Sequence, residues 1–178
     1  MRAWSKTILS VYKYLEALSK AIDDLVLKKS INSAFYCNGR FDTAYECANK
    51  IMQLTNRKIN LINLKVLVED TLESIPLKYR RVLGLCYIDG VKTTECAELL
   101  HISNRTFFRL KNDAINVFTQ KLIGSGYTKS KLEEIFCGEN WLKNLYNHNS
   151  DNAQKDFDAD LRKYRFFKNV IREFNMVY

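Results

Sequence analysis

Proline and glycine are scarce in this sequence, and their scarcity limits the folds open to it. The 178 residues include one proline and six glycines, well below the average usage of both. β-Sandwiches, β-barrels and doubly wound α/β sheets need frequent turns, which draw on these two residue types. Hydrophobic residues make up 47% of the chain, enough for a sizeable core. We therefore expect an all-α protein built as a helical bundle.

The clearest periodic pattern lies in the first 29 residues. Apolar side chains recur there in alternating steps of four and three, at Trp4, Ile8, Val11, Leu15, Leu18, Ile22 and Leu25. This stripe predicts one long helix with a single apolar seam. An antiparallel hairpin within the chain or a coiled coil between two chains would bury it. The hairpin is favoured because the chain offers other long helices to pack on, and a homodimer through residues 4–25 is the alternative.

A second long helix is expected after a turn signal at residues 38–40. Asp42 or Thr43 can cap its start, and residues 43–46 fit the capping-box pattern. Because no proline or glycine follows until residue 76, this region predicts one helix to about Ser74, or two joined near Asn60.

The chain after residue 122 is expected to form a C-terminal helical cap. Gly124, Ser125 and Gly126 form a linker, and a capping box at residues 130–133 opens a helix that runs to about Tyr146. Residues 147–152 are polar and predict a loop. A final helix carries aromatic and aliphatic side chains at helical spacing: Phe157, Leu161, Tyr164, Phe167, Ile171 and Phe174. The expected parts are an N-terminal helical hairpin (1–60), a central domain (61–122) and the C-terminal region (123–178).

The central part has the pattern of a helix-turn-helix. Pro76 suits the first turn of a short helix that ends at Asp89-Gly90. Residues 93–100 then predict a two-turn helix, 101–103 a tight turn, and 104–121 a longer helix. Ala97 is small where two helices must approach closely, and Ser103 can cap the second helix. A common core is expected from Leu99 or Leu100, with Ile102, Phe107 and Leu110.

One face of the second helix carries side chains suited to reading DNA. Arginine can form a fork to guanine, asparagine can pair with adenine, and a phenyl ring can touch a thymine methyl. The residues expected to contact bases are Asn104, Arg105, Phe108, Arg109 and Asn112. Phe107 and Phe108 are adjacent, so at least one of them must belong to the core.

A further set of residues is expected to contact the sugar-phosphate backbone. These residues supply cationic or hydroxyl groups near the helix that enters the groove, and they would set affinity without reading sequence. They are Lys78, Arg80, Arg81, Lys92, Thr93, Thr94, Ser103, Thr106 and Lys111. The net charge of +8 favours a polyanionic partner, but +5 of it falls in residues 1–60 and only +2 in residues 61–122. Charge alone therefore does not locate the site.

The central segment resembles region four of sigma-70-type RNA polymerase sigma factors. The resemblance rests on residues 72–83 (LESIPLKYRRVL), on 87–90 (YIDG) and on the helix-turn-helix that follows. Residues 105–118 are closer still to region-four-like regulators of phages and mobile elements. The resemblance implies recognition of promoter-like double-stranded DNA and contact with RNA polymerase. His101 stands where the family usually has glycine, and Cys96 where it usually has isoleucine.

Residues 1–60 lack the pattern of sigma region two, so a regulator with a region-four-like domain is expected in place of a complete sigma factor. The competing hypothesis is an adaptor that docks on RNA polymerase or another regulator without reading DNA. A third interpretation keeps DNA binding but uses it in recombination or packaging. Steep salt dependence of duplex binding separates the DNA-binding hypotheses from the adaptor.

Other function classes have little support in the sequence. Cysteines at 37, 47, 86, 96 and 137 form no Cys-x-x-Cys pair, so free buried thiols are expected and no metal site. We find no nucleophile in a catalytic context and no glycine-rich phosphate loop, which predicts neither enzyme activity nor a cofactor. Without an apolar run of 18 residues or a secretory signal, the expected location is the cytoplasm.

Overall fold

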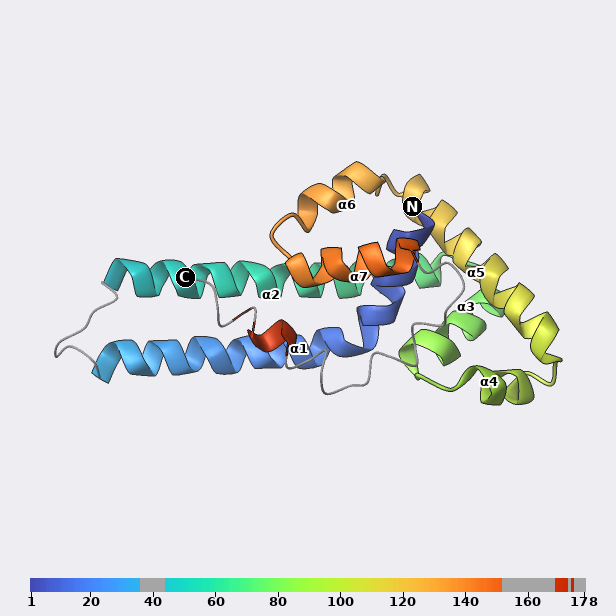
Figure 1. Ribbon diagram of the computed structural model, residues 1–178, viewed down its shortest axis with the longest axis horizontal. Coiled ribbons are helices and arrows are strands. Elements are labelled where there is room, and N and C mark those ends of the chain that lie inside the picture. Colours follow the sequence, from blue (N-terminus) through green and yellow to red (C-terminus); the bar gives the residue numbers. More distant parts are fainter. Residues whose placement is uncertain (36–43, 152–168, 173, 175–178) are drawn as a thin grey trace. The chain divides into compact units, whose positions relative to one another are not determined.

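The computed structural model describes residues 1–35, 44–151, 169–172 and 174, and this part of the chain contains helices and no strand (Figure 1). The helices are α1 (Arg2–Phe35), α2 (Ala44–Glu73), α3 (Leu77–Leu83), the π-helical η1 (Gly84–Ile88), α4 (Thr93–Leu99), α5 (Asn104–Gly124), α6 (Lys129–Ile135) and α7 (Asn140–Asp151). The all-α prediction is confirmed. No helix among the described residues has both the length and the apolar character needed to cross a membrane.

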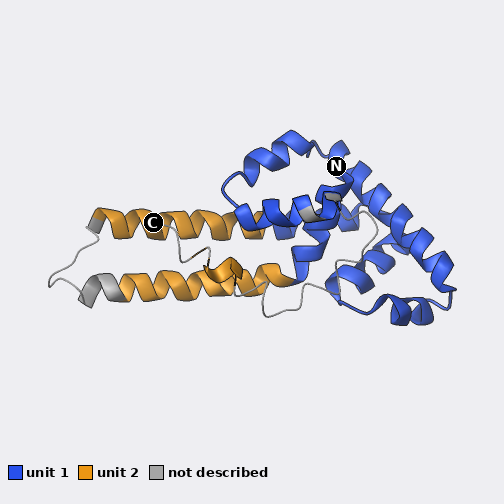
Figure 2. Ribbon diagram, viewed as in Figure 1, with its two compact units in different colours: residues 1–13, 64–158 blue, residues 14–63, 159–178 orange. Residues whose placement is uncertain are grey.

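The chain divides into two compact units, which Figure 2 shows in different colours. Unit 1 holds residues 1–13 and 64–158, and unit 2 holds residues 14–63 and 159–178. The first turns of α1 therefore group with α3 to α7 and not with the remainder of their own helix. The predicted division into three parts, with boundaries at residues 60 and 122, stays a prediction.

In unit 1, the first turns of α1 pack among α5, α6 and α7. Trp4 is fully buried, and its ring stacks on that of Tyr146 with centroids 4.6 Å apart. The Thr119 hydroxyl on α5 donates to Ser5 Oγ over 2.8 Å. Asn149 Nδ2 on α7 donates to Thr7 Oγ1, also over 2.8 Å. Aromatic stacking and these two hydrogen bonds thus fix the first two turns of α1 against helices more than 100 residues away in sequence.

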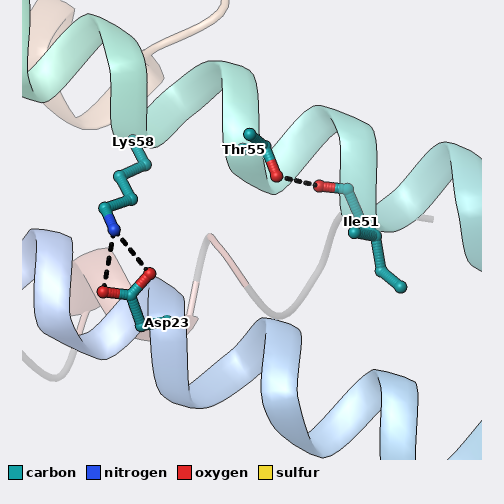
Figure 3. A network of polar contacts seen from close by, with 4 residues as sticks. All are labelled: Asp23, Ile51, Thr55 and Lys58. Atoms are coloured by element: carbon teal, nitrogen blue, oxygen red, sulfur yellow. Dashed lines mark hydrogen bonds and ion pairs between the residues drawn. The ribbon is translucent and has the colours of Figure 1, made fainter.

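In unit 2, residues 14–35 of α1 and 44–63 of α2 form a helical hairpin. Lys58 Nζ donates to both carboxylate oxygens of Asp23, over 2.7 and 2.9 Å (Figure 3). On α2, the Thr55 hydroxyl bonds back to the Ile51 carbonyl over 2.9 Å (Figure 3). Leu54 and Leu61 are buried, and α2 continues through Asn60 without a break, as the one-helix alternative predicted.

The apolar seam at the start of the chain is buried within the protein. The six residues from Trp4 to Ile22 in the predicted stripe are at most 1% exposed, and Leu25 is half-buried. Internal packing of the seam is therefore confirmed. A homodimer through residues 4–25 would have to pull the seam away from the core that already covers it. The predicted turn at 38–40 and the caps Asp42 and Thr43 lie outside the described residues.

The helices after residue 126 differ from the prediction. Thr128 caps α6, accepting a hydrogen bond from the Lys131 amide over 3.3 Å, so the predicted cap Ser130 lies inside the helix. The helix expected over 130–146 is interrupted at residues 136–139. Residues 147–151, expected as a loop, continue α7. Because of the interruption, Phe136 and Trp141 both face the core, and each is under 5% exposed. In one continuous helix, two residues five positions apart would not lie on the same face.

The final predicted helix is only partly described. Phe157, Leu161, Tyr164 and Phe167 lie outside the described residues. Residues 169–172 are helical, with Ile171 half-buried, and Phe174 is buried with the Arg57 guanidinium 5.3 Å from its ring centroid.

The described cysteines are free thiols. Cys86 and Cys96 are buried, as predicted. Cys47 is half-buried and Cys137 is exposed, so the prediction of buried thiols is wrong for these two residues. Cys37 lies outside the described residues.

Replacement of Trp4 should weaken the fold strongly. We expect Trp4→Ala to lower the free energy of unfolding by about 3–5 kcal/mol, because it empties a fully buried aromatic position. Trp4→Phe should cost clearly less, since it keeps a ring and removes an indole N–H that finds no acceptor in the described part of the chain. Urea denaturation followed by circular dichroism measures both. Equal losses for the two variants would contradict the role given to ring packing.

Candidate nucleic-acid interface

A Schellman turn separates α4 from α5. The Ile102 amide donates to the Ala97 carbonyl, and the His101 amide to the Glu98 carbonyl, each over 3.0 Å. This pair of bonds requires a left-handed residue between them, and His101 has φ of 52°. Glycine adopts this conformation without strain, while histidine accepts it at some cost. The turn was predicted at these residues, and the unusual histidine stands at the position that bends the chain.

Ser103 then begins α5 as its N-cap. Its Oγ accepts a hydrogen bond from the Thr106 amide over 3.2 Å, and the Ser103 and Thr106 hydroxyls lie 2.9 Å apart. This bond satisfies one of the free amides of the first turn. The predicted capping role of Ser103 is confirmed.

One face of α5 is buried against its neighbours. Phe107, Ala114, Ile115 and Phe118 are at most 1% exposed, and α3 and α4 both pack against α5. Cys96 and Ala97 of α4 are buried as well, which agrees with the predicted close approach at Ala97. In the predicted common core, Leu100, Ile102 and Leu110 are half-buried, and Leu99 is 59% exposed and does not contribute.

The opposite face of α5 is exposed. Phe108 is 45% exposed and Phe107 is fully buried, which settles which of the two rings belongs to the core. All the residues expected to contact bases are exposed: Asn104, Arg105, Phe108, Arg109 and Asn112. Their spacing by three, four and one keeps them on one side of the helix. No acidic residue occurs in the first turn, so this surface attracts anions.

Comparison with protein families identifies this arrangement. Residues 65–110, from the end of α2 to the second turn of α5, match the family model of sigma-70, region 4. The segment is a sigma-70 region 4-like helix-turn-helix. The resemblance inferred from the sequence is confirmed. No curated protein and no solved structure matches the chain. Region 4 is a DNA-binding, regulatory kind of domain in transcription and not a catalytic one.

The residues expected to contact the sugar-phosphate backbone differ in their exposure. Lys78, Arg81 and Lys92 are exposed, with the Lys92 ammonium 3.8 Å from a Glu95 carboxylate oxygen and that of Lys78 4.6 Å from the Tyr79 ring centroid. Among the hydroxyl residues, Thr94 is exposed and Thr93 is half-buried.

Arg80 has a structural role that the sequence analysis missed. Its Nε donates to the Leu72 carbonyl over 2.9 Å, and its Nη2 donates to the Glu73 carbonyl. These are free carbonyls of the last turn of α2, where a cation also interacts favourably with the helix dipole. The side chain is half-buried and directed at α2, so we remove Arg80 from the residues expected to contact phosphate.

Lys111 is also placed differently from the prediction. It is 5% exposed, and its ammonium lies 5.3 Å from the ring centroid of Tyr87. The reason is helical spacing, because Lys111 follows Phe107 by four residues and so shares its buried face. A buried ammonium cannot reach a phosphate, and this spacing could have shown as much from the sequence.

Arg2 joins the exposed face of α5, which the sequence analysis did not foresee. Its Nη2 donates to Asn112 Oδ1 over 2.8 Å. The two residues are 110 positions apart, and neither periodicity nor a motif connects them.

The contact of Arg80 with α2 predicts a difference between adjacent arginines. Arg80→Ala should lower the free energy of unfolding by about 1–3 kcal/mol, since it removes two charge-assisted hydrogen bonds. Arg81→Ala changes an exposed side chain and should alter the free energy of unfolding by less than about 0.5 kcal/mol. Chemical denaturation of the two variants in the same buffer makes the comparison. Equal stability of the two would refute the structural role of Arg80.

The left-handed conformation of His101 predicts that glycine and valine at this position differ in their effect on stability. His101→Gly should change the free energy of unfolding by less than about 1 kcal/mol, because relief of strain offsets the larger entropy of the unfolded chain. His101→Val should lower it by about 1–2 kcal/mol, because a β-branched residue is poorly tolerated at positive φ. Thermal and urea unfolding of both variants provide the values. A valine variant as stable as the glycine variant would contradict a left-handed residue 101.

Proposed function

We propose that this protein binds double-stranded DNA sequence-specifically through the start of α5 and acts in transcription initiation as a region 4-like regulator. The observation that carries the proposal is the division of α5 into a buried face, fixed by Phe107, and an exposed face with two arginines. A helix about 10–12 Å across fits a major groove that is about 12 Å wide.

The exposed side chains have the chemistry that base reading requires. The guanidinium groups of Arg105 and Arg109 can each donate two hydrogen bonds to the O6 and N7 atoms of guanine. Asn104 can pair with adenine, and the exposed Phe108 ring suits contact with a thymine methyl. Because Ser103 caps the helix and the Schellman turn precedes it, the backbone of the first turn of α5 is fixed, so the positions from which these side chains extend are set before DNA binds.

The sugar-phosphate backbone is proposed to contact exposed and half-buried residues of the preceding elements and of the helix start. These are Lys78, Arg81, Lys92, Thr93, Thr94, Ser103 and Thr106, while Arg80 and Lys111 are excluded by their contacts. RNA polymerase is proposed as the protein partner, in line with the sigma-70, region 4 match.

Substitution of the two reading arginines tests the proposal. Duplex fragments bound by the full-length protein are first selected from random DNA, with and without RNA polymerase. On the selected site, Arg105→Ala and Arg109→Ala should each weaken binding by about 1–3 kcal/mol and relax the preference at particular base pairs. Fluorescence anisotropy on the selected site and on its single-base variants measures both effects.

Two matched variants complete this experiment. Arg81→Ala should weaken binding to all sequences alike and reduce the salt slope by about one unit. Lys143→Ala removes an exposed cation from α7, which lies away from the start of α5 in Figure 1, and should leave binding unchanged. Failure to select any sequence, or duplex binding without salt dependence, would refute the proposal in favour of an adaptor that does not read DNA.

A further inference from the structure

The contact between Arg2 and Asn112 changes the roles of both residues at the DNA-binding surface. Both lie outside the segment that matches sigma-70, region 4. The inference rests on the proposed function and concerns which residues complete the surface. From this geometry we infer that Arg2 contacts a DNA phosphate at the edge of the major groove, and that Asn112 is a positioning residue for Arg2 and not a base-reading residue.

The Oδ1 atom of Asn112, which adenine recognition would need, already accepts a hydrogen bond from Arg2. An asparagine that reads adenine accepts a hydrogen bond from the N6 amino group through its Oδ1 and donates to N7 through its Nδ2. In this structure, Oδ1 already accepts from Arg2 over 2.8 Å. The bond from Arg2 uses one of the two lone pairs of Oδ1 and fixes the orientation of the amide. Adenine recognition would therefore have to use the remaining lone pair in that orientation, or displace a charge-assisted hydrogen bond.

The position of Asn112 along α5 also places it beyond the groove floor. Eight residues separate it from Asn104, which corresponds to about 12 Å along the helix axis. The first residues of a recognition helix contact bases, and the major groove is about 12 Å wide. With the first turn of α5 at the bases, a side chain two turns further along lies toward the groove edge, where the phosphates are.

Arg2 is suited to a phosphate at that edge. Its side chain is exposed, and within the described part of the chain it forms no ion pair, so its charge is not neutralised. The bond to Asn112 uses one of five N–H donors and leaves others for a phosphate oxygen. Arginine binds phosphate in a bidentate manner, which a lysine cannot reproduce.

The fold holds Arg2 in place from its other side. Trp4, two residues further on, is fully buried, and Ser5 accepts a hydrogen bond from Thr119 of α5 over 2.8 Å. Residues 1–13 and α5 belong to the same compact unit (Figure 2). With its backbone fixed at Trp4 and its guanidinium fixed at Asn112, Arg2 loses little conformational freedom when it binds a phosphate.

The experiment compares Arg2→Ala, Arg2→Lys, Asn112→Ala and the double variant Arg2→Ala/Asn112→Ala in the full-length protein, with Lys143→Ala as the charge-matched control. Binding to the DNA duplex selected by the unmodified protein, and to its single-base variants, is measured by fluorescence anisotropy over a series of salt concentrations. Arg2→Ala should lower affinity several-fold on every sequence and reduce the salt slope by about one unit. Arg2→Lys should keep the slope, because it keeps the charge, and lose part of the affinity.

Asn112→Ala should lower affinity less than Arg2→Ala and leave the ranking of sequences unchanged. In the double variant its effect should disappear, because Asn112 would act only through Arg2. A salt slope and affinity of Arg2→Ala equal to those of the unmodified protein would overturn the inference. A change in base preference for Asn112→Ala would overturn the positioning role. Absence of salt-dependent duplex binding by the unmodified protein would instead refute the proposed function itself.

Discussion

The burial of one face of α5 is the constraint on which the candidate site depends. Phe107 is the first large side chain of the helix to enter the core, and Ala114, Ile115 and Phe118 follow at helical spacing. Once these four are buried, rotation of α5 about its axis is no longer free, and the side on which Arg105 and Arg109 stand must face outward. Exposure of the arginines is thus a consequence of apolar packing and needs no favourable interaction of its own.

The turn before α5 fixes the direction of the helix in the same way that the core fixes its rotation. The two Schellman bonds satisfy carbonyls at the end of α4, and Ser103 satisfies an amide at the start of α5. The connection between α4 and α5 is only residues 100–103, and the bonds at its two ends restrict the angle between the helices. The left-handed His101 is the cost of this short connection, and it is offset by the backbone bonds on either side.

Features that depend on neighbours in sequence were predictable, and features that depend on distant residues were not. The seam from Trp4 to Ile22, the cap at Ser103 and the turn at His101 each follow from spacing or from the conformational preference of one residue. Arg80 was misassigned because exposure was inferred from residue type, whereas its guanidinium reaches back to carbonyls on the preceding helix. Lys111 was misassigned for the same reason, although its spacing from Phe107 already placed it on the buried face. The break between α6 and α7 arises because Phe136 and Trp141 both enter a core that includes Trp4, a partner that periodicity cannot reveal.

The interaction of Arg2 with Asn112 shows how the start of α1 can shape the exposed face of α5 next to the region 4-like match. The helix-turn-helix alone supplies the buried face, the turn and the first two turns of α5. The second half of α5 gains its neighbours from the start of α1, through Ser5 at Thr119 and Arg2 at Asn112. The same packing that buries Trp4 therefore brings an additional cation to the exposed face. This packing couples the folding of the first turns of α1 to the charge of the exposed face of α5. Loss of the Trp4 contact would therefore reduce that charge even with every residue of the matched segment in place.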